Sequence, residues 1–310
     1  MKAVRLHSRG GPEQLVYEDA SLPDPPAGEV RVRVFAAGIT PTELTWDATY
    51  QTPDGRDRLP SIPGHDVSGV VEALGRGVTA VSPGDAVYGL IDFPRDGSAA
   101  EFVAVPAAHL APKPGSLDHV RAAAVPLSAL TAWQALFDHA GLAAGQKVLI
   151  HGAAGGVGTF AVQLARWRGA QVSGTTSTDN ADFLRALGVE TVIDYRAARF
   201  EDLLRDVDVV LDTVGGETLE RSWRVLRPGG RLVSIAARPS PEQARIADVR
   251  GVFFIVEPSR PQLIELARLI DEGHVRPVLE AVFPLVQARA AFERGLSGHH
   301  RGKIVLQVAS

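Results

Sequence analysis

Residues 151–158 read HGAAGGVG, so four of eight positions are glycine, and this stretch directly follows the apolar segment KVLI. The residues after it, 157–168, have the composition of a helix. Apolar segments typical of strands then alternate with helical ones, with strands expected at 147–152, 170–176, 191–195, 207–214 and 230–236 and helices near 180–187 and 217–226. This alternation predicts βαβ units in a parallel sheet.

The glycine-rich stretch has the register Ala153-x-Gly155-x-x-Gly158, with Ala in place of the first glycine of the G-x-G-x-x-G pattern. In a dinucleotide-binding βαβ unit, Gly155 would let a pyrophosphate approach the main chain and Gly158 would let the helix pack closely. The amides that open the helix, at Gly156 and Val157, would face the anion. We interpret the stretch as a dinucleotide-binding loop; the alternative is a tight turn with a structural role only.

The end of the second predicted strand indicates which dinucleotide binds. An NAD site usually has Asp or Glu about 20 residues after the glycines, but this chain has GTTST at 174–178. Thr176, Ser177 and Thr178 can donate hydrogen bonds to a 2′-phosphate, which a carboxylate would repel. Tyr195 and Arg196, after the third strand, could lie on the same side. We therefore predict NADPH as the cofactor; a solvated polar turn at 174–178 is the alternative.

The first third of the chain has a different pattern. The segment 29–39 alternates charged and apolar residues, as in a half-buried strand, and segments 67–78, 86–91 and 99–107 are further short strands separated by Gly and Pro. Such a series predicts a compact β-rich domain. The C-terminal part is mixed, with an amphipathic helix at 261–275 and a closing strand at 303–308.

Composition limits the function. The length of 310 residues suits two domains. The formal net charge is −4, without a dense basic run, so nucleic acid and anionic membrane are poor partners. No window approaches 18 apolar residues, and the N-terminus does not resemble a signal peptide, so we expect a cytoplasmic protein. The absence of cysteine excludes disulfides, thiolate nucleophiles and thiolate metal ligands.

Five motifs stand out along the chain: LTAWQAL (130–136), AAGQKVLIHGAAGGVGTFAVQLAR (143–166), LGVETVIDYR (187–196), VLDTVGG (210–216) and HRGKIVL (300–306). Together they resemble the medium-chain dehydrogenase/reductase superfamily and, within it, the zinc-independent quinone oxidoreductase (zeta-crystallin-like) branch. The resemblance implies an α/β protein: a GroES-like β-rich domain from 1–119 and 257–310, and a Rossmann domain with a doubly wound parallel sheet at 120–256, with the cofactor in the cleft between them.

The resemblance also implies further cofactor contacts. Val214 and Gly215 would pass beneath the nicotinamide ribose, and Phe253 and Phe254 would border the nicotinamide end. Lys303 would reach a phosphate; its alternative is a solvated charge at a strand end.

Zinc-dependent members of the family place Cys, His and Glu where this chain has Thr40, His65 and Asp66. One His and one Asp cannot complete the ligand shell of a catalytic zinc, so we expect metal-free chemistry with His65 as a hydrogen-bonded wall of the cleft; the alternative for His65 is a metal ligand. The pair of histidines at 299–300 is expected to lie in a solvated loop.

Without a metal, the hydride acceptor must carry negative charge on its own conjugated oxygen, as quinones and α,β-unsaturated carbonyls can. Thr40 could donate a hydroxyl hydrogen bond to it. Tyr50 is a second candidate for a cleft hydroxyl; the alternative for Tyr50 is a surface loop.

We therefore expect an NADPH-dependent, zinc-independent reductase of quinones or conjugated enones. The alternatives are an enoyl or alkenal reductase of a biosynthetic pathway, and an NADP(H)-binding protein without turnover. The apolar segment GVFFIV at 251–256 reads as a strand near the sheet edge, and pairing of this edge across a two-fold axis would give the homodimer that we expect; the alternative is a monomer in which the edge is covered.

Overall fold

The computed structural model describes residues 1–298 and 301–309 and divides them into two units. Unit 1 comprises residues 1–130, 257–273 and the chain from 277 on, and unit 2 comprises 131–256 with 274–276. The domain bounds expected from the sequence, 1–119 with 257–310 and 120–256, stay predictions. Ala123 and Ala124, which precede the end of the first segment of unit 1 at 130, belong to a buried cluster of that unit together with Ala36 and Val305.

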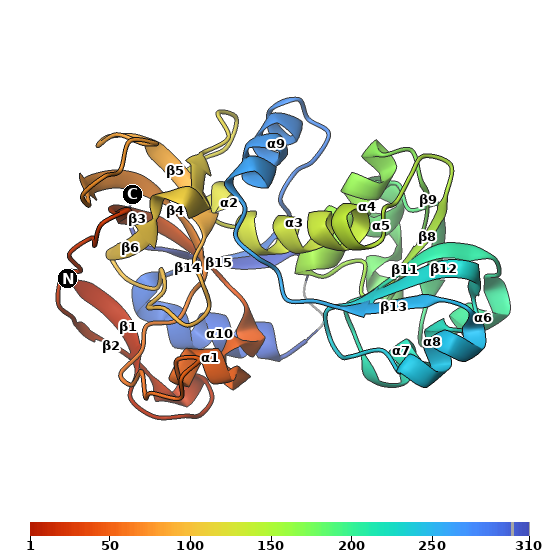
Figure 1. Ribbon diagram of the computed structural model, residues 1–310. Coiled ribbons are helices and arrows are strands. Elements are labelled where there is room, and N and C mark those ends of the chain that lie inside the picture. Colours follow the sequence, from red (N-terminus) through yellow and green to blue (C-terminus); the bar gives the residue numbers. More distant parts are fainter. Residues whose placement is uncertain (299–300, 310) are drawn as a thin grey trace. The chain divides into compact units, whose positions relative to one another are not determined.

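Unit 2 contains a parallel sheet with the strand order β10-β9-β8-β11-β12-β13 over the described residues. This is the order of a doubly wound dinucleotide-binding sheet, which confirms the predicted fold class. Figure 1 shows α4 and α5 on one side of the sheet and α7 and α8 on the other. The strands are β8 (Lys147–Ile150), β9 (Gln171–Thr176), β10 (Thr191–Asp194), β11 (Val207–Asp212), β12 (Leu226–Ser234) and β13 (Arg250–Phe253).

The helical segments of unit 2 lie close to their predicted places. The helix expected at 217–226 ends earlier, at Ser222, because β12 already begins at Leu226, opposite Val207. The helical segments are η4 (Gln134–His139, π-helical), α4 (Gly156–Trp167), η5 (Thr178–Asn180), α5 (Ala181–Leu187), α6 (Phe200–Leu203), α7 (Gly216–Ser222) and α8 (Pro241–Ala247).

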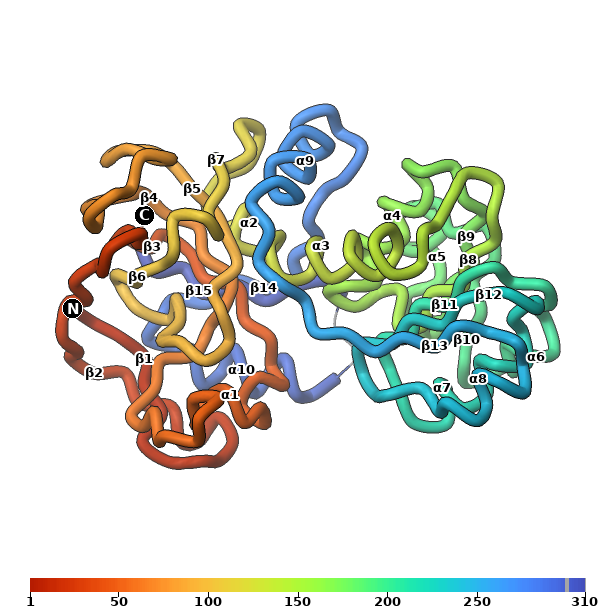
Figure 2. The backbone as a smooth tube through the Cα atoms, viewed as in Figure 1, coloured from red at the N-terminus to blue at the C-terminus, as the bar shows by residue number. Residues whose placement is uncertain are grey.

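Unit 1 is built on a mixed sheet with the described order β14-β15-β3-β4-β5-β7, and β6 also pairs with β3. Figure 2 shows the C-terminal β15, in blue, beside the N-terminal β3. In β3 the valines at 30, 32 and 34 are buried between more exposed arginines, as the alternation predicted. The strands are β1 (Lys2–Leu6), β2 (Leu15–Asp19), β3 (Glu29–Ile39), β4 (Asp66–Leu74), β5 (Ala86–Leu90), β6 (Phe102–Pro106), β7 (Leu110–Pro112), β14 (Leu279–Pro284) and β15 (Lys303–Gln307).

Short helical segments close the loops of unit 1. Pro126 opens α3, where its missing amide proton is not needed. The segments are η1 (Pro12–Gln14), η2 (Pro41–Thr45), α1 (Asp47–Tyr50), η3 (Ala107–His109), α2 (His119–Ala122), α3 (Pro126–Trp133, which crosses the division at 130), α9 (Arg260–Asp271), η6 (Leu285–Gln287) and α10 (Ala288–Leu296). None of the described helices combines the length and apolar character that a bilayer crossing requires.

Candidate functional site

The glycine-rich loop connects β8 to α4. Gly152 adopts a positive φ of 66°, and the Gly155 amide donates to the Gly152 carbonyl at 3.0 Å, which closes a tight turn. Gly155 occupies the N-cap position of α4 and has no side chain, so no side chain caps the first amides of this 12-residue helix. The uncapped amides and the positive end of the helix dipole together suit an anion such as a pyrophosphate.

The glycines of this loop have different steric roles. A Cβ built on Gly158 would lie 2.3 Å from the Gly152 carbonyl oxygen and 2.7 Å from the Ala153 Cα. A Cβ on Gly155 would meet only the Gly152 oxygen, at 3.3 Å. Ala153 is fully buried and its amide donates to the Thr175 carbonyl. Gly158 therefore permits the helix to pack on the loop, whereas Gly155 leaves open space above it.

The residues predicted to bind a 2′-phosphate lie at the ends of β9 and β10. Thr176 and Ser177 are almost fully buried, whereas Tyr195 is half exposed. Asp194 pairs in register with Thr176, accepts hydrogen bonds from the Thr178 hydroxyl and the Arg196 amide, and has a pKa lowered mainly by the Thr178 hydroxyl. Sequence reasoning did not identify this carboxylate, although it stands directly before Tyr195 in the VIDY motif.

A second loop, 213–216, follows β11. The buried carboxylate of Asp212 accepts hydrogen bonds from the amides of Val214 and Gly215 and from the Ser234 hydroxyl. Gly215 has a φ of +77°, which disfavours a side chain there. The Val214 side chain is 55% exposed. Asp212 thus fixes the main chain of this loop, and the Val214 side chain points to solvent.

The two phenylalanines lie at and just beyond the edge strand. Phe253 ends β13 and is half-buried, with the Arg238 guanidinium 5.0 Å from its ring. Phe254 is nearly buried, and its ring lies 4.4 Å from that of His139. Their predicted place at the nicotinamide end stays a prediction.

A buried ion pair in unit 1 joins the first residue of β15 to the first residue of β4. The Lys303 Nζ lies 2.9 Å from Asp66 Oδ2, donates to the Ile39 carbonyl at 3.0 Å, and lies 3.4 Å from Thr40 Oγ1. Lys303 is 5% exposed, so the alternative of a solvated strand-end charge is wrong. Its three partners use the three donors of an ammonium group. A phosphate contact for Lys303 stays a prediction.

Next to this pair, His65 Nε2 lies 3.3 Å from Glu43 Oε2, and both side chains are buried. The Gly64 amide donates to the same carboxyl oxygen at 2.9 Å. Burial raises the pKa of Glu43 to about 7 and lowers the pKa of His65 to about 3. The histidine is therefore neutral at physiological pH.

The ring of His65 also belongs to an aromatic cluster. Trp46 stacks on it at 6.0 Å between ring centroids, and Phe93 meets it edge-on at 4.9 Å. Trp46 and Phe93 contact each other at 5.1 Å. Because both are partly exposed, they form an aromatic wall with His65 behind it.

The two predicted hydroxyl donors differ in their surroundings. Tyr50 is 2% exposed and its hydroxyl donates to the Leu44 carbonyl at 2.6 Å, so the surface-loop alternative is wrong. This bond occupies the phenol proton, and a role for Tyr50 as a cleft hydroxyl stays a prediction. Thr40 is half-buried, and its hydroxyl oxygen faces Lys303 and can still donate its own proton.

Sequence reasoning also did not identify Glu43. The signal was present, because Thr40 and Glu43 have the T-x-x-E spacing of a capping box with Pro41 at the first helical position. The Thr40 amide donates to Glu43 Oε1 at 3.4 Å. The pattern marks a helix start; it gives no indication that the carboxyl group also reaches His65.

The residues at this place do not fit a zinc ion. The chain has no cysteine, and among the residues described there is no group of three or more His, Asp or Glu side chains arranged for a metal. Asp66 is engaged by Lys303 and by the Leu127 amide, and Glu43 by two amides. The histidines at 299–300 lie outside the described residues. We derive no step through a metal.

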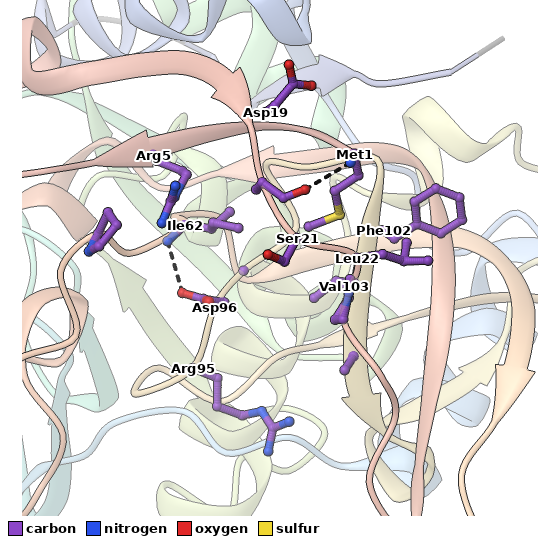
Figure 3. A pocket seen from close by; sticks show the side chains of 15 residues that line it. Met1, Arg5, Asp19, Ser21, Leu22, Ile62, Arg95, Asp96, Phe102 and Val103 are labelled. Atoms are coloured by element: carbon purple, nitrogen blue, oxygen red, sulfur yellow. Dashed lines mark hydrogen bonds between the residues drawn. The ribbon is translucent and has the colours of Figure 1, made fainter.

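A cavity of about 750 Å³ opens elsewhere in unit 1 (Figure 3). Its charged side chains are already paired: Arg95 with Glu29, and Asp96 with the Ile62 amide. No predicted site residue lines it. We assign it no part in the chemistry.

Two deeply buried histidines, His65 and His151, make the protein sensitive to acid. Burial lowers the pKa of His151 to about 4. Both stay neutral in the folded chain, so the stability that they contribute is present above their unfolded pKa near 6.5 and is lost as pH falls toward 4 and 3. Glu43 acts in the opposite sense, since its raised pKa favours folding below 4.5 and this contribution is lost as pH rises through 7.

We expect both histidines to lower the free energy of unfolding as pH falls from 6.5 toward 4, and Glu43 to offset part of this loss. Urea unfolding at pH 7.0, 5.5 and 4.5 measures this change. His65→Gln should reduce the pH dependence, and His7→Gln, at an exposed histidine, should leave it unchanged. Equal pH dependence in H65Q and the unaltered protein would contradict the assignment of a buried neutral imidazole.

Comparisons with known proteins agree with this architecture. Residues 26–115 match the model of an alcohol dehydrogenase GroES-like domain, and residues 187–306 match that of a zinc-binding dehydrogenase. The mitochondrial NAD(P)H oxidoreductase RTN4IP1 of Danio rerio is 35% identical over 90% of this chain and 84% of its own length.

Two further proteins are similar over almost the whole chain. A 2-methylene-furan-3-one reductase of Solanum lycopersicum is 33% identical over 99% of this chain and 79% of its own length. The structure of a quinone oxidoreductase from Coxiella burnetii superposes with a TM-score of 0.92 at 33% identity, covering 99% of both chains.

Proposed function

Because this chain belongs to the medium-chain dehydrogenase/reductase superfamily, we propose that it is a zinc-independent oxidoreductase that transfers hydride from NADPH to quinones or conjugated enones. Membership makes it an oxidoreductase that uses a nicotinamide dinucleotide. The NADPH preference, the acceptor and the metal-free chemistry are the proposed part. The observation that carries the proposal is the N-terminus of α4. Its first amides have no side-chain cap, and the space above Gly155, where a side chain would lie, is open.

In this proposal, unit 2 binds the cofactor. The amides of Gly156 and Val157 and the space above Gly155 hold the pyrophosphate, and Thr176 and Ser177 donate to the 2′-phosphate. Val214 and Gly215 support the nicotinamide side. When bound, the reduced nicotinamide supplies the hydride.

In this proposal, unit 1 provides the hydrogen-bond donor for the oxygen of the hydride acceptor. Thr40 donates a hydrogen bond to the acceptor oxygen as that oxygen gains negative charge, and the Lys303 ammonium, 3.4 Å from the Thr40 oxygen, makes the hydroxyl a stronger donor. Trp46 and Phe93 favour a flat conjugated acceptor by stacking. The name of the tomato relative, a reductase of a methylene furanone, supports the enone class.

Asp194 supports a different cofactor preference. A carboxylate at the end of a neighbouring strand could accept hydrogen bonds from ribose hydroxyls and repel a 2′-phosphate, which would favour NADH. Its two oxygens accept one hydrogen bond each, from Thr178 and Arg196, and each keeps a further lone pair for a ribose hydroxyl. Direct comparison of the two cofactors decides between them.

The test is oxidation of NADPH and of NADH with 9,10-phenanthrenequinone, 1,4-benzoquinone and a short enone, with and without EDTA. We expect turnover that prefers NADPH and survives EDTA. Thr40→Val should lower kcat about 10- to 100-fold and leave the KM for NADPH unchanged, as expected for a donor acting on the acceptor alone. Preference for NADH, or loss of activity with EDTA, would overturn the respective part of the proposal.

We further propose a homodimer formed through β13. This strand pairs with β12 on one side only and ends the sheet, and Ile255 beyond it is 64% exposed. A second copy would cover this edge. Sedimentation equilibrium that returns the mass of one chain would contradict it. The cytoplasmic location also remains a proposal, since some relatives are named as mitochondrial.

A further inference from the structure

His151 links several parts of unit 2. It stands directly after β8 and before Gly152, and it is fully buried. Its Nδ1 lies 3.1 Å from the Thr175 hydroxyl on β9, and its Nε2 lies 3.1 Å from the Ser222 hydroxyl on α7. The ring thus bridges a strand and a helix that are 47 residues apart in the sequence.

The hydroxyl groups determine which ring nitrogen carries the proton. Ser222 donates its only hydroxyl proton to the Thr218 carbonyl at 2.7 Å, so its oxygen must accept from His151 Nε2–H. The neutral ring then has a bare Nδ1, which accepts from the Thr175 hydroxyl. The Thr175 oxygen in turn accepts from the Gly152 amide at 3.3 Å. These bonds form one hydrogen-bond series, from the Gly152 amide through Thr175, His151 and Ser222 to the Thr218 carbonyl, in which every donor has one acceptor.

The series reaches both loops that we assign to the cofactor. At one end, the Thr175 hydroxyl oxygen accepts from the Gly152 amide. The Gly152 carbonyl oxygen accepts from the Gly155 amide, and Gly158 packs against the same oxygen. At the other end it holds α7, whose first residue, Gly216, is the last residue of loop 213–216. A second hydrogen bond connects the same two loops, because the Thr213 hydroxyl donates to the main-chain carbonyl of His151 at 2.8 Å.

We propose that His151 is a positioning residue that couples the glycine-rich loop 152–158 to loop 213–216, so that the two loops bind the dinucleotide as one preformed site. This inference rests on the proposed function and assigns a role that the sequence motif did not contain. Preformed loops do not have to be ordered when the ligand binds, which raises affinity.

A double-mutant cycle tests the coupling. Thr175→Val breaks the link to the glycine loop and Ser222→Ala breaks the link to α7; dissociation constants for NADPH come from a fluorescence titration. We expect each change to raise the dissociation constant about tenfold, the size of one lost buried hydrogen bond, and the double variant to be little worse than either single variant. Independent effects would multiply to about 100-fold and would overturn the coupling.

Two controls separate positioning from general loss of structure. Thr175→Ser keeps the hydroxyl and should restore affinity close to that of the unaltered protein, whereas Thr191→Val, at an exposed threonine on β10, should leave affinity unchanged. A T175S variant as weak as T175V would contradict the role of the hydroxyl.

Nitrogen NMR of the unaltered protein gives a readout that requires no variant to fold. We expect a neutral His151 with the proton on Nε2 at pH 7, with or without cofactor. A proton on Nδ1 would overturn the hydrogen-bond series. If the unaltered protein bound neither NADPH nor NADH, the proposed function and the coupling would both fail; if it bound and the effects multiplied, only the coupling would.

Discussion

Asp66→Ala should lower the free energy of unfolding by about 3–5 kcal/mol, because it leaves the Lys303 ammonium buried without a counter-charge. The two groups are 2.9 Å apart, and their side chains are 0% and 5% exposed. Asp66 also accepts from the Leu127 amide, so its loss removes a tie between β4 and the start of α3.

The double variant shows whether the pair acts as a unit. Lys303→Met keeps an unbranched side chain that is one atom shorter and removes its charge, and we expect Asp66→Ala with Lys303→Met to lose less stability than the two single changes added together. Urea unfolding of all four proteins measures this. The pair Lys2–Asp19 has the same 2.9 Å separation at the surface, and Asp19→Ala should leave stability nearly unchanged. Additive losses at 66 and 303 would contradict a coupled buried pair.

The second large effect concerns the glycine loop. Gly158→Ala should abolish measurable cofactor binding and lower the melting temperature, because its Cβ would overlap the Gly152 oxygen and the Ala153 main chain, and backbone atoms cannot move aside as a flexible side chain can. Gly155→Ala meets one atom at 3.3 Å in an ordinary backbone conformation, so it should fold normally.

Gly155→Ala should nevertheless weaken NADPH binding by about 10- to 100-fold, since a methyl group would occupy the space through which a phosphate approaches the main chain. Thermal unfolding and a fluorescence titration on both variants separate the two effects. If G155A bound NADPH as tightly as the unaltered protein, the pyrophosphate would not lie above Gly155. Unchanged stability in G158A would contradict the close packing of α4.

Much of the fold could be predicted from local patterns. The alternation of strands and helices after residue 147 is a property of neighbouring residues, and it predicted the order of elements that builds the parallel sheet of unit 2. The end of α7 was predicted less well. Its last turn competes with the pairing of Leu226 opposite Val207, and this pairing depends on a strand that lies elsewhere in the sequence.

The candidate site divides in the same way. Glycine spacing after an apolar strand is sufficient to indicate a dinucleotide loop, because the requirement of close approach acts on consecutive residues. The lack of cysteine is likewise a property of composition. Sequence by itself thus determined the fold class and the absence of thiolate metal ligands, and it predicted the cofactor loop.

Only the tertiary structure brought Lys303 to Asp66, Glu43 to His65, and His151 to both Thr175 and Ser222. These partners are separated by about 20 to more than 200 residues, so no local pattern specifies them. The pKa values of the buried groups follow from the same cause, because desolvation and the few donors and acceptors within hydrogen-bond distance exist only once strands from distant parts of the chain have packed together.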